Sequence, residues 1–287
     1  MKNLKKAQTQ QPILYLKIFV AVVLFLVIFS LIFKFVRLVG KSQFKSNSLT
    51  VLVVNHDAYI LQIKKNPREL SVLKISQFGN IAKSQSRLSN SIFLGIPLDA
   101  EIIDSADLFS GDTSSLFSFG NLTSVLLGSK NLKLENMNEL DFFNVYKSIK
   151  SVSQKDIIVQ KIDNYSHAYT KDRDNTENLI YQTFKNRSIL NDITSIEVVN
   201  ATEVDGSGSK VSQMLKNAGY NILSVSSSDK SEKSKIVIRV DNPLLEKRLK
   251  SLFEIPIEKV HEQHISDVSI VLGRDMSQEM ERLPGFN

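Results

Sequence analysis

The Asp-Gly-Ser-Gly turn at residues 205–208 is the segment whose composition best suits a binding site. Glycines that precede a helix can let backbone N–H groups cradle a phosphate. The third glycine of a dinucleotide-binding loop and the lysine spacing of a P-loop are both missing. An ordinary strand-to-helix turn capped by Ser207 or Ser209 is therefore the favoured interpretation. The candidate ligand-facing residues of this turn are Asn200, Thr202, Gly206, Ser207 and Gly208.

The segment His261-Glu262-Gln263-His264 superficially resembles a zinc-binding motif. Its histidines are three positions apart, whereas four positions would place both on one face of a helix beside a catalytic glutamate. A zinc site also needs further ligands and supporting hydrogen bonds. We predict no metal site here.

An acidic stretch, which comprises Asp99, Glu101, Asp104 and Asp107, has the ligand chemistry that magnesium prefers. No fixed loop geometry accompanies it, so a solvated acidic face is the favoured interpretation. No Ser, His and Asp grouping forms a recognisable nucleophile turn. We therefore predict no catalytic residue, no metal ligand and no cofactor.

Residues 13–33 form the longest apolar run, 21 positions interrupted only by Lys17 and Ser30. As a helix this run would be roughly 31 Å long, which matches the hydrocarbon core of a bilayer. The apolar region of a signal peptide is shorter and ends at a small-residue cleavage site. The run predicts a single transmembrane helix.

Positive charge is concentrated around this helix. Residues 1–45 contain eight basic and no acidic residues, and subtracting these from the 36 basic residues of the chain leaves 28 against 30 acidic ones. The net charge of +6 is thus a membrane-flanking feature, which argues against nucleic acid as a partner. Because basic residues flank both ends of the helix in similar numbers, charge alone leaves the orientation open.

The middle of the chain has an α/β pattern. Strands are expected at residues 49–55, 59–63, 70–75, 91–96 and 157–162, helices at 139–149 and around 177–184, and helix-like or apolar pieces at 106–119 and 121–128.

The last hundred residues predict the order β-α-β-β-α-β. Strands are expected at residues 196–200, 222–225, 235–240 and 268–272, with a short extra strand at 257–260. Gly219 is placed to cap the first helix at its C-terminus, and Pro243 suits the first turn of the second. The fold class is α/β (α+β), with a sheet covered by helices in a C-terminal sandwich.

These patterns divide the chain into seven segments. We expect a cytoplasmic tail at 1–12, the transmembrane helix at 13–33, a juxtamembrane linker at 34–47, an α/β domain at 48–163, a polar linker at 164–192, a C-terminal domain at 193–276 and a tail at 277–287.

The C-terminal segment resembles the LytR/CpsA/Psr C-terminal domain family. The resemblance extends over residues 196–276 and is carried by a strand, an Asn-Gly-Thr-like turn, a helix, a Gly-aromatic turn and a final strand that ends in Gly-x-Asp. Ala201 stands where the family has glycine. The matching residues are Asn200, Thr202, Gly206, Gly219, Tyr220, Gly273 and Asp275.

The middle segment faintly resembles a degenerate LytR-CpsA-Psr catalytic domain, in which Asp57 would match a family aspartate. Members of that class transfer glycopolymers from a lipid carrier with magnesium, aspartates and arginines. Where the family has Ile-Pro-Arg-Asp, this chain has Ile-Ser-Gln-Phe at residues 75–78. Without that arginine and aspartate, the largest catalytic contribution is lost, so we predict no transferase activity.

The resemblance therefore implies a non-enzymatic protein of the cell envelope, anchored in the cytoplasmic membrane by one span, with most of the chain outside the cytoplasm. Its partners would be the lipid bilayer and a cell-wall or surface glycopolymer or another envelope protein. Two alternatives remain: a magnesium-dependent glycopolymer phosphotransferase with a rearranged site at Asp57 and residues 99–107, and a protein-protein assembly factor in an envelope complex.

Overall fold

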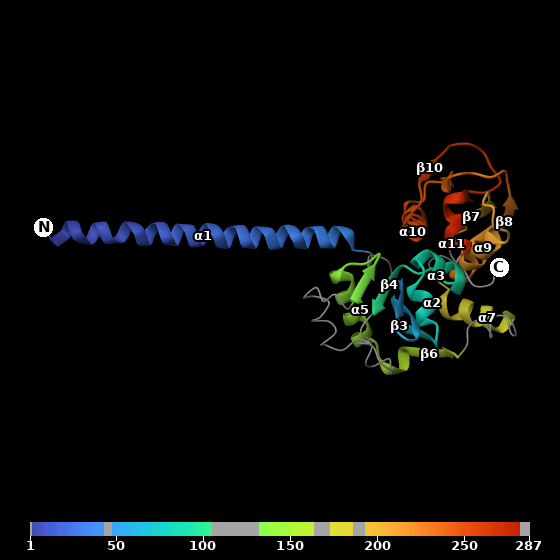
Figure 1. Ribbon diagram of the computed structural model, residues 1–287, viewed down its shortest axis with the longest axis horizontal. Coiled ribbons are helices and arrows are strands. Elements are labelled where there is room, and N and C mark those ends of the chain that lie inside the picture. Colours follow the sequence, from blue (N-terminus) through green and yellow to red (C-terminus); the bar gives the residue numbers. More distant parts are fainter. Residues whose placement is uncertain (1, 43–47, 105–131, 164–172, 186–192, 282–287) are drawn as a thin grey trace.

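The computed structural model describes residues 2–42, 48–104, 132–163, 173–185 and 193–281 of the chain. A single long helix projects from a folded part that contains two mixed β-sheets and their covering helices (Figure 1). The predicted pieces at 106–119 and 121–128 lie outside the described residues.

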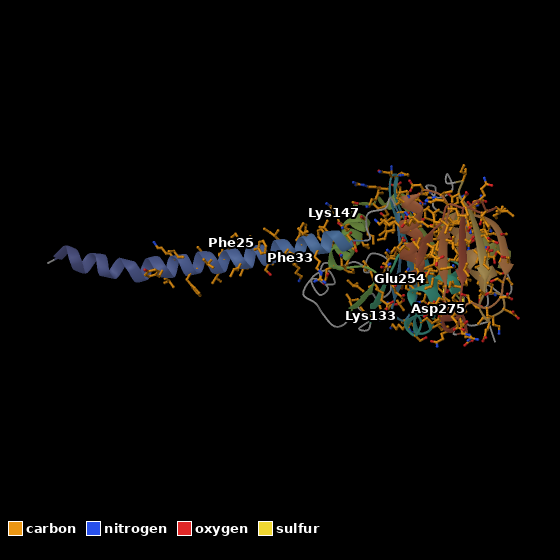
Figure 2. The ribbon with its side chains drawn as sticks, turned by 90° about the horizontal axis from the view of Figure 1, so that it is seen from above. Phe25, Phe33, Lys133, Lys147, Glu254 and Asp275 are labelled. Atoms are coloured by element: carbon orange, nitrogen blue, oxygen red, sulfur yellow. The ribbon has the colours of Figure 1, made fainter. Side chains whose placement is uncertain are left out.

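Helix α1 (Lys2–Lys41) contains the candidate membrane span, Tyr15–Arg37, with a mean hydropathy of 3.0. Its apolar side chains point away from the rest of the protein; Phe25 and Phe33 are each 65% exposed (Figure 2). A core helix of a soluble protein would bury this surface, whereas a lipid-facing helix exposes it. The span is roughly 35 Å long at the α-helical rise, enough to cross a bilayer with some tilt.

Helix α1 extends beyond the predicted transmembrane segment at both ends. The expected tail at 1–12 is helical from Lys2, and the expected linker at 34–47 is helical as far as Lys41. No proline follows residue 33 in this segment, so nothing in the backbone chemistry stops the helix before Gly40.

The first sheet has the order β5-β4-β1-β2-β3-β6. Strands β1 (Ser48–Val54), β2 (Ala58–Lys65) and β3 (Arg68–Ile75) form an antiparallel meander. Strand β4 (Ala100–Asp104) lies parallel to β1, β5 (Leu132–Glu135) antiparallel to β4, and β6 (Ile157–Ile162) parallel to β3.

Both faces of this sheet are covered, which explains the continuous apolar sequence of β1. Leu52 and Val54 pack on the face that bears α2 (Gly79–Lys83), α3 (Arg87–Leu94) and α7 (Arg173–Phe184). Val51 and Val53 pack on the opposite face against α5 (Glu139–Ser151), which is followed by a short 3-10 turn, η1 (Gln154–Asp156).

The strand predicted at residues 91–96 is wrong, because this segment belongs to helix α3 and the turn after it. The Ser86 hydroxyl accepts a hydrogen bond from Ser89 N–H and caps the N-terminus, and Gly95, at φ 63°, ends the helix in the left-handed region. Both signals are in the sequence, but a short apolar run fits a buried strand equally well.

The second sheet has the order β10-β9-β11-β7-β8. Its strands are β7 (Ser195–Asn200), β8 (Asn221–Ser227), β9 (Lys235–Ile238), β10 (Ile257–Lys259) and β11 (Val268–Leu272). Helix α9 (Ser207–Ala218) follows β7, and α10 (Pro243–Phe253) follows β9. The predicted element order is confirmed, with Gly219 as the C-cap of α9 and Pro243 in the first turn of α10.

The N-cap predicted for α9 is wrong. Gly206, at φ 78°, occupies that position without a side-chain cap, and the Ser207 hydroxyl instead donates a hydrogen bond to the Val204 carbonyl. The left-handed conformation that the turn requires is one that glycine adopts without strain.

The segment expected as a tail, 277–287, begins with a short helix. A 3-10 turn, η2 (Arg274–Met276), leads into α11 (Ser277–Glu281), and the side chains of Met276 and Met280 are buried. These two side chains are buried by elements distant in the sequence, so no long hydrophobic periodicity marks the segment in the sequence. Residues 282–287 lie outside the described part.

One apolar core joins the two sheets. Leu52 and Ile75 of the first sheet belong to the same cluster as Ile196, Met214 and Leu249 of the C-terminal unit. Asn217 of α9 donates a hydrogen bond to the Gly95 carbonyl across this junction, at 2.8 Å. The two units are therefore packed together as one body.

Candidate functional site

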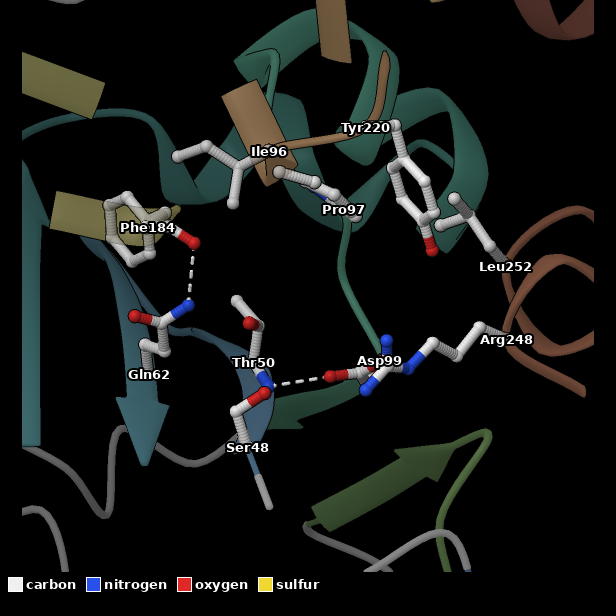
Figure 3. Close-up of a pocket in the computed structure, with 11 residues that line it drawn as sticks. Ser48, Thr50, Gln62, Ile96, Pro97, Asp99, Phe184, Tyr220, Arg248 and Leu252 are labelled. Atoms are coloured by element: carbon white, nitrogen blue, oxygen red, sulfur yellow. Dashed lines mark hydrogen bonds between the residues drawn. The ribbon is translucent and has the colours of Figure 1, made fainter. Parts of the chain in front are cut away.

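A small cavity opens where the first sheet meets the C-terminal unit (Figure 3). Its free volume is about 70 Å³, enough for a few water molecules or the end of one ligand group. The lining residues come from β1, β2, the α3–β4 connection, α7, the end of α9 and α10: Ser48, Thr50, Gln62, Ile96, Pro97, Asp99, Phe184, Ala218, Tyr220, Arg248 and Leu252.

Asp99 supplies a carboxylate to this cavity. Its Oδ2 accepts a hydrogen bond from Thr50 N–H at 2.7 Å. Burial raises the pKa of Asp99 to about 6, although the Thr50 hydrogen bond and the charges of Arg87 and Arg248 oppose the shift. A carboxyl group with this pKa gains its charge just below neutral pH.

Gln62 supplies an unused hydrogen-bond acceptor. Its Nε2 donates to the Phe184 carbonyl at 2.7 Å, whereas its Oε1, although buried, accepts no hydrogen bond from the described residues. A buried acceptor without a partner is unfavourable, so a bound donor group would be stabilised there. Gln62 thus adds an acceptor to the carboxylate of Asp99 and the guanidinium of Arg248 (Figure 3).

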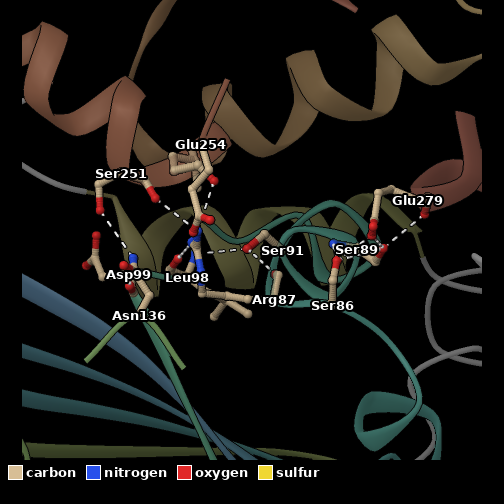
Figure 4. Close-up of polar contacts among 11 residues, drawn as sticks. Ser86, Arg87, Ser89, Ser91, Leu98, Asp99, Asn136, Ser251, Glu254 and Glu279 are labelled. Atoms are coloured by element: carbon tan, nitrogen blue, oxygen red, sulfur yellow. Dashed lines mark hydrogen bonds and ion pairs between the residues drawn. The ribbon is translucent and has the colours of Figure 1, made fainter. Parts of the chain in front are cut away.

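Arg87 holds the walls of this junction in place (Figure 4). Its guanidinium donates to the Leu98 carbonyl at 2.5 Å and to the carbonyls of Ser251 and Leu252, at 2.9 and 3.3 Å, in the last turn of α10. It also forms an ion pair with Glu254 at 2.5 Å. A cation at a helix C-terminus is favoured by the helix dipole and bonds the last carbonyls.

Two further polar contacts cross the junction. Asn136 Nδ2 donates to the Asp99 carbonyl at 2.8 Å and to the Ser251 hydroxyl at 3.3 Å. The hydroxyls of Ser86 and Ser89 both bond the Glu279 carboxylate of α11 (Figure 4). The junction is thus held together by side chains far apart in the sequence.

The glycine turn that sequence patterns favoured uses its polar atoms internally. Asn200 Oδ1 accepts from the Thr202 hydroxyl at 2.7 Å, and Thr202 Oγ1 in turn accepts from Val204 N–H at 3.0 Å. A Cβ at Gly208 would lie 3.1 Å from Val225 Cγ1, so close packing also explains this glycine. The structure gives these five candidate residues a structural role, and ligand binding by them stays a prediction.

Asp57, which matches the family aspartate, forms a local structural contact. Its carboxylate pairs with Lys74 at 2.8 Å and accepts from Gln77 N–H at 2.9 Å. Desolvation raises the pKa of Asp57, but these hydrogen bonds outweigh it and the pKa lies below the usual value. Phe78, in the tetrapeptide that replaces the family's Arg-Asp pair, is buried and stacks on Phe93 with ring centroids 5.3 Å apart.

The acidic stretch does not gather into one site among the described residues. Asp99 contacts the start of β1 at Thr50, whereas Asp57 follows the other end of that strand, roughly 15 Å away at the strand rise. Asp104, the last residue of β4, lies at the same end of the sheet as Asp57, because Val54 pairs with Ile103. The side chain of Asp104 and all of Asp107 lie outside the described residues.

Glu101 lies inside the protein rather than on a solvated face. It is fully buried, and burial together with the nearby Glu135 charge raises its pKa to about 8. The expectation of a solvated acidic surface is wrong for this residue, because the alternation of β4 turns it toward Asn90 of α3, which donates to it at 3.2 Å. Within the described residues no three His, Cys, Asp or Glu side chains form a metal-binding group.

The fold and the candidate span define a mixed α/β protein with an N-terminal apolar helix that is long enough to cross a membrane. Residues 194–275 match the family LytR_C, described as LytR cell envelope-related transcriptional attenuator, so the C-terminal unit is a LytR C-terminal domain. This confirms the resemblance drawn from residues 196–276.

No curated protein sequence matches the chain. Among solved structures, the Lin1025 protein from Listeria innocua is 12% identical, with coverage of 84% of this chain and 98% of that protein. The TM-score of 0.18 is too low to indicate a shared fold.

Residues that carry the family resemblance stabilise the domain. A Cβ at Gly273 would lie 2.4 Å from the Lys233 carbonyl carbon, so only glycine fits there. Asp275 Oδ1 accepts from Ser234 N–H at 2.9 Å and from its hydroxyl at 2.5 Å. Tyr220 alone among the matching residues also lines the cavity. Sequence patterns missed Gln62, Arg87 and Arg248, because no local signal marks a contact made across the fold.

Proposed function

We propose that this chain is a non-catalytic, membrane-anchored protein of the cell envelope that binds or scaffolds a cell-wall or surface glycopolymer outside the cytoplasmic membrane. The apolar surface of α1 supports the anchor, and the LytR C-terminal domain supports a role in the cell envelope. The cavity that this domain shares with the first sheet carries the binding part of the proposal.

The chemistry of the cavity suits one unit of a polyhydroxylated, anionic chain. Arg248 offers a delocalised cation that bonds phosphate or carboxylate groups, and Asp99 and Gln62 offer acceptors for hydroxyl groups. Tyr220 adds an aromatic ring with a polar end. The free volume admits only the tip of a ligand, so most of a bound polymer would lie along the outside of the junction.

The surroundings of Asp57 support the proposal that the chain does not catalyse glycopolymer transfer. Lys74 and the Gln77 backbone already occupy its carboxylate, and Phe78 places a core side chain in the tetrapeptide where the family has charged groups. Phosphoryl transfer depends on arginine and metal charges aimed at the reacting phosphate.

Binding is tested by sedimentation of the full chain, in detergent micelles, with purified cell walls. We expect retention of the unaltered chain and about tenfold weaker retention of Arg248→Gln, since a charge-assisted hydrogen bond contributes about 1.5–3 kcal/mol. Lys247→Gln, an exposed neighbour on α10, is the matched control and should bind normally. No retention, or equal retention of both variants, would contradict the proposal.

Catalysis is tested by incubation with a polyprenyl-diphosphate-linked glycan and magnesium. We expect no transfer and no release of phosphate. Turnover that disappears in Asp57→Ala would overturn the non-catalytic assignment and restore the transferase alternative.

A further inference from the structure

A basic groove lies on the first sheet, away from the junction cavity. It has a volume of about 390 Å³ and is formed by the turn between β2 and β3 together with the second half of α5. None of its lining residues in the described chain is acidic, and they comprise Lys64, Lys65, Asn66, Arg68, Lys147, Ser148, Ser151 and Val152.

Basic side chains predominate among the lining residues of this groove. Lys64 pairs with Glu69 at 3.0 Å, and Lys65, Arg68 and Lys147 also line the groove. Both Arg68 and Lys147 are exposed. A cleft lined by one sign of charge concentrates ions of the opposite sign, so this groove attracts anions.

The outer face of α5 continues the groove and adds an apolar residue. Phe143, Lys147 and Lys150 follow one another at i, i+4 and i+7 and are all exposed, Phe143 to 39%. The opposite face buries Phe142 and Val145 in the core. An exposed aromatic ring flanked by lysines is typical of helices that lie in a membrane interface.

The first turn of α5 lies beside the C-terminal end of α1. The Ser42 hydroxyl, directly after α1, donates a hydrogen bond to Asp141 in the first turn of α5. Figure 1 places α5 on the side of the folded part from which α1 projects, and Figure 2 places Lys147 near the C-terminal end of α1. From Arg37 to Lys41 the helix rises about 6 Å, which is comparable to the thickness of one headgroup layer.

We propose that the groove and the exposed face of α5 bind the phosphate groups of anionic lipids in the bilayer that α1 spans. The first sheet then rests on the membrane surface through α5, and the junction cavity is held at a defined height above it. This inference depends on the membrane anchor but not on the glycopolymer-binding part of the proposed function.

The test uses the full chain, which contains no cysteine, so that Ser148→Cys introduces a unique labelling position in the groove. The protein is reconstituted in vesicles of phosphatidylcholine alone or with 30% phosphatidylglycerol and labelled with a membrane-impermeant fluorophore. A lipid with a nitroxide on its headgroup serves as the quencher. Flotation of the vesicles reports insertion of α1 independently of the groove.

We expect quenching to be at least threefold stronger in the anionic vesicles and to fall toward the neutral-vesicle level at 0.5 M salt, because salt screens exposed charges. The combination Lys65→Glu, Arg68→Glu and Lys147→Glu should abolish the difference, since each basic residue near an anionic surface changes the partition coefficient about fivefold. The combination Lys216→Glu, Lys233→Glu and Lys247→Glu makes the same charge change on exposed positions of the C-terminal unit and should leave quenching unchanged.

Three outcomes would overturn the inference. They are equal quenching in both vesicle types, equal losses in the two triple variants, and a fluorescence change produced by inorganic phosphate with no response to phosphatidylglycerol. The last result would identify a soluble phosphate ligand instead of the lipid. Failure of flotation would refute the anchor itself, whereas the cell-wall sedimentation assay decides the glycopolymer proposal separately.

Discussion

Replacement of Arg87 by methionine should loosen the junction between the two units. The side chain is 5% exposed, and its guanidinium donates to three carbonyls, two of them in the last turn of α10. Methionine keeps much of the volume but leaves these carbonyls without a donor. Loss of a buried, hydrogen-bonded charge costs about 3–5 kcal/mol, and we expect the lower half of that range because water can enter from the open cleft beside Arg87.

The assay is thermal unfolding of the full chain in detergent, followed by circular dichroism. At about 2–4 °C per kcal/mol, the expected cost lowers Tm by roughly 6–16 °C for a cost of 3–4 kcal/mol. Amide hydrogen exchange in residues 245–254 should accelerate more than exchange in β2 and β3, because the lost bonds hold the end of α10.

The matched control for this prediction is Glu254→Gln. The Glu254 side chain is 63% exposed, so its ion pair with Arg87 is largely screened by solvent and should contribute less than about 1 kcal/mol. A Tm within 2 °C of the unaltered protein for Arg87→Met, or equal losses for both variants, would refute the assignment of Arg87 as the residue that joins the units.

Three further predictions concern buried residues. The folded-state pKa of Glu101, about 8, exceeds its unfolded value of 4.5, so the folded state binds the proton more tightly. The free energy of unfolding should therefore fall as pH rises from about 5 to 8, by at most about 1.4 kcal/mol per pH unit. Glu101→Gln should flatten this dependence in Tm measurements, and an unchanged slope would contradict it. Gly273→Ala should cost more than about 2 kcal/mol in denaturant unfolding, since its Cβ would meet backbone at 2.4 Å, whereas Gly40→Ala, with nothing within 4 Å, should be nearly neutral. Asn217→Ala should cost about 1–2 kcal/mol by loss of its bond to Gly95, and an equal effect of Lys216→Ala, an exposed residue on α9, would argue against that contact.

Local signals in the sequence predicted the C-terminal unit well. Gly219 ends α9, and Pro243 begins α10 behind the Asn242 cap, because these residue types satisfy or avoid the backbone groups exposed at helix ends. The same reasoning failed at residues 91–96, where Ser86 and Gly95 marked a helix but the short apolar run favoured a strand. Period and composition cannot separate a buried strand from a buried helix at that length.

The candidate site was predicted less well than the fold. The glycine turn was a candidate site because its residue types are those of phosphate-binding loops. In the structure, however, the Thr202 hydroxyl donates a hydrogen bond to Asn200 within the turn. Gln62 and Arg248 had no distinguishing pattern, since an isolated polar residue acquires significance only from the residues packed around it. Glu101 had been grouped with exposed acids, and only the packing of α3 over β4 showed that it is buried.

The sequence by itself determined the apolar length of α1, the charge that flanks it, the order of elements in the last hundred residues and their resemblance to the LytR C-terminal domain. These properties depend on neighbours a few positions apart, which the chain order already specifies. Tertiary structure alone decided that the two units share one core, that Arg87 reaches Ser251 and Leu252, and that Ser42 at the end of α1 contacts Asp141 of α5. Such contacts join residues about 100 positions or more apart, and which of them form is decided by how apolar faces pack and by which buried polar groups must find partners.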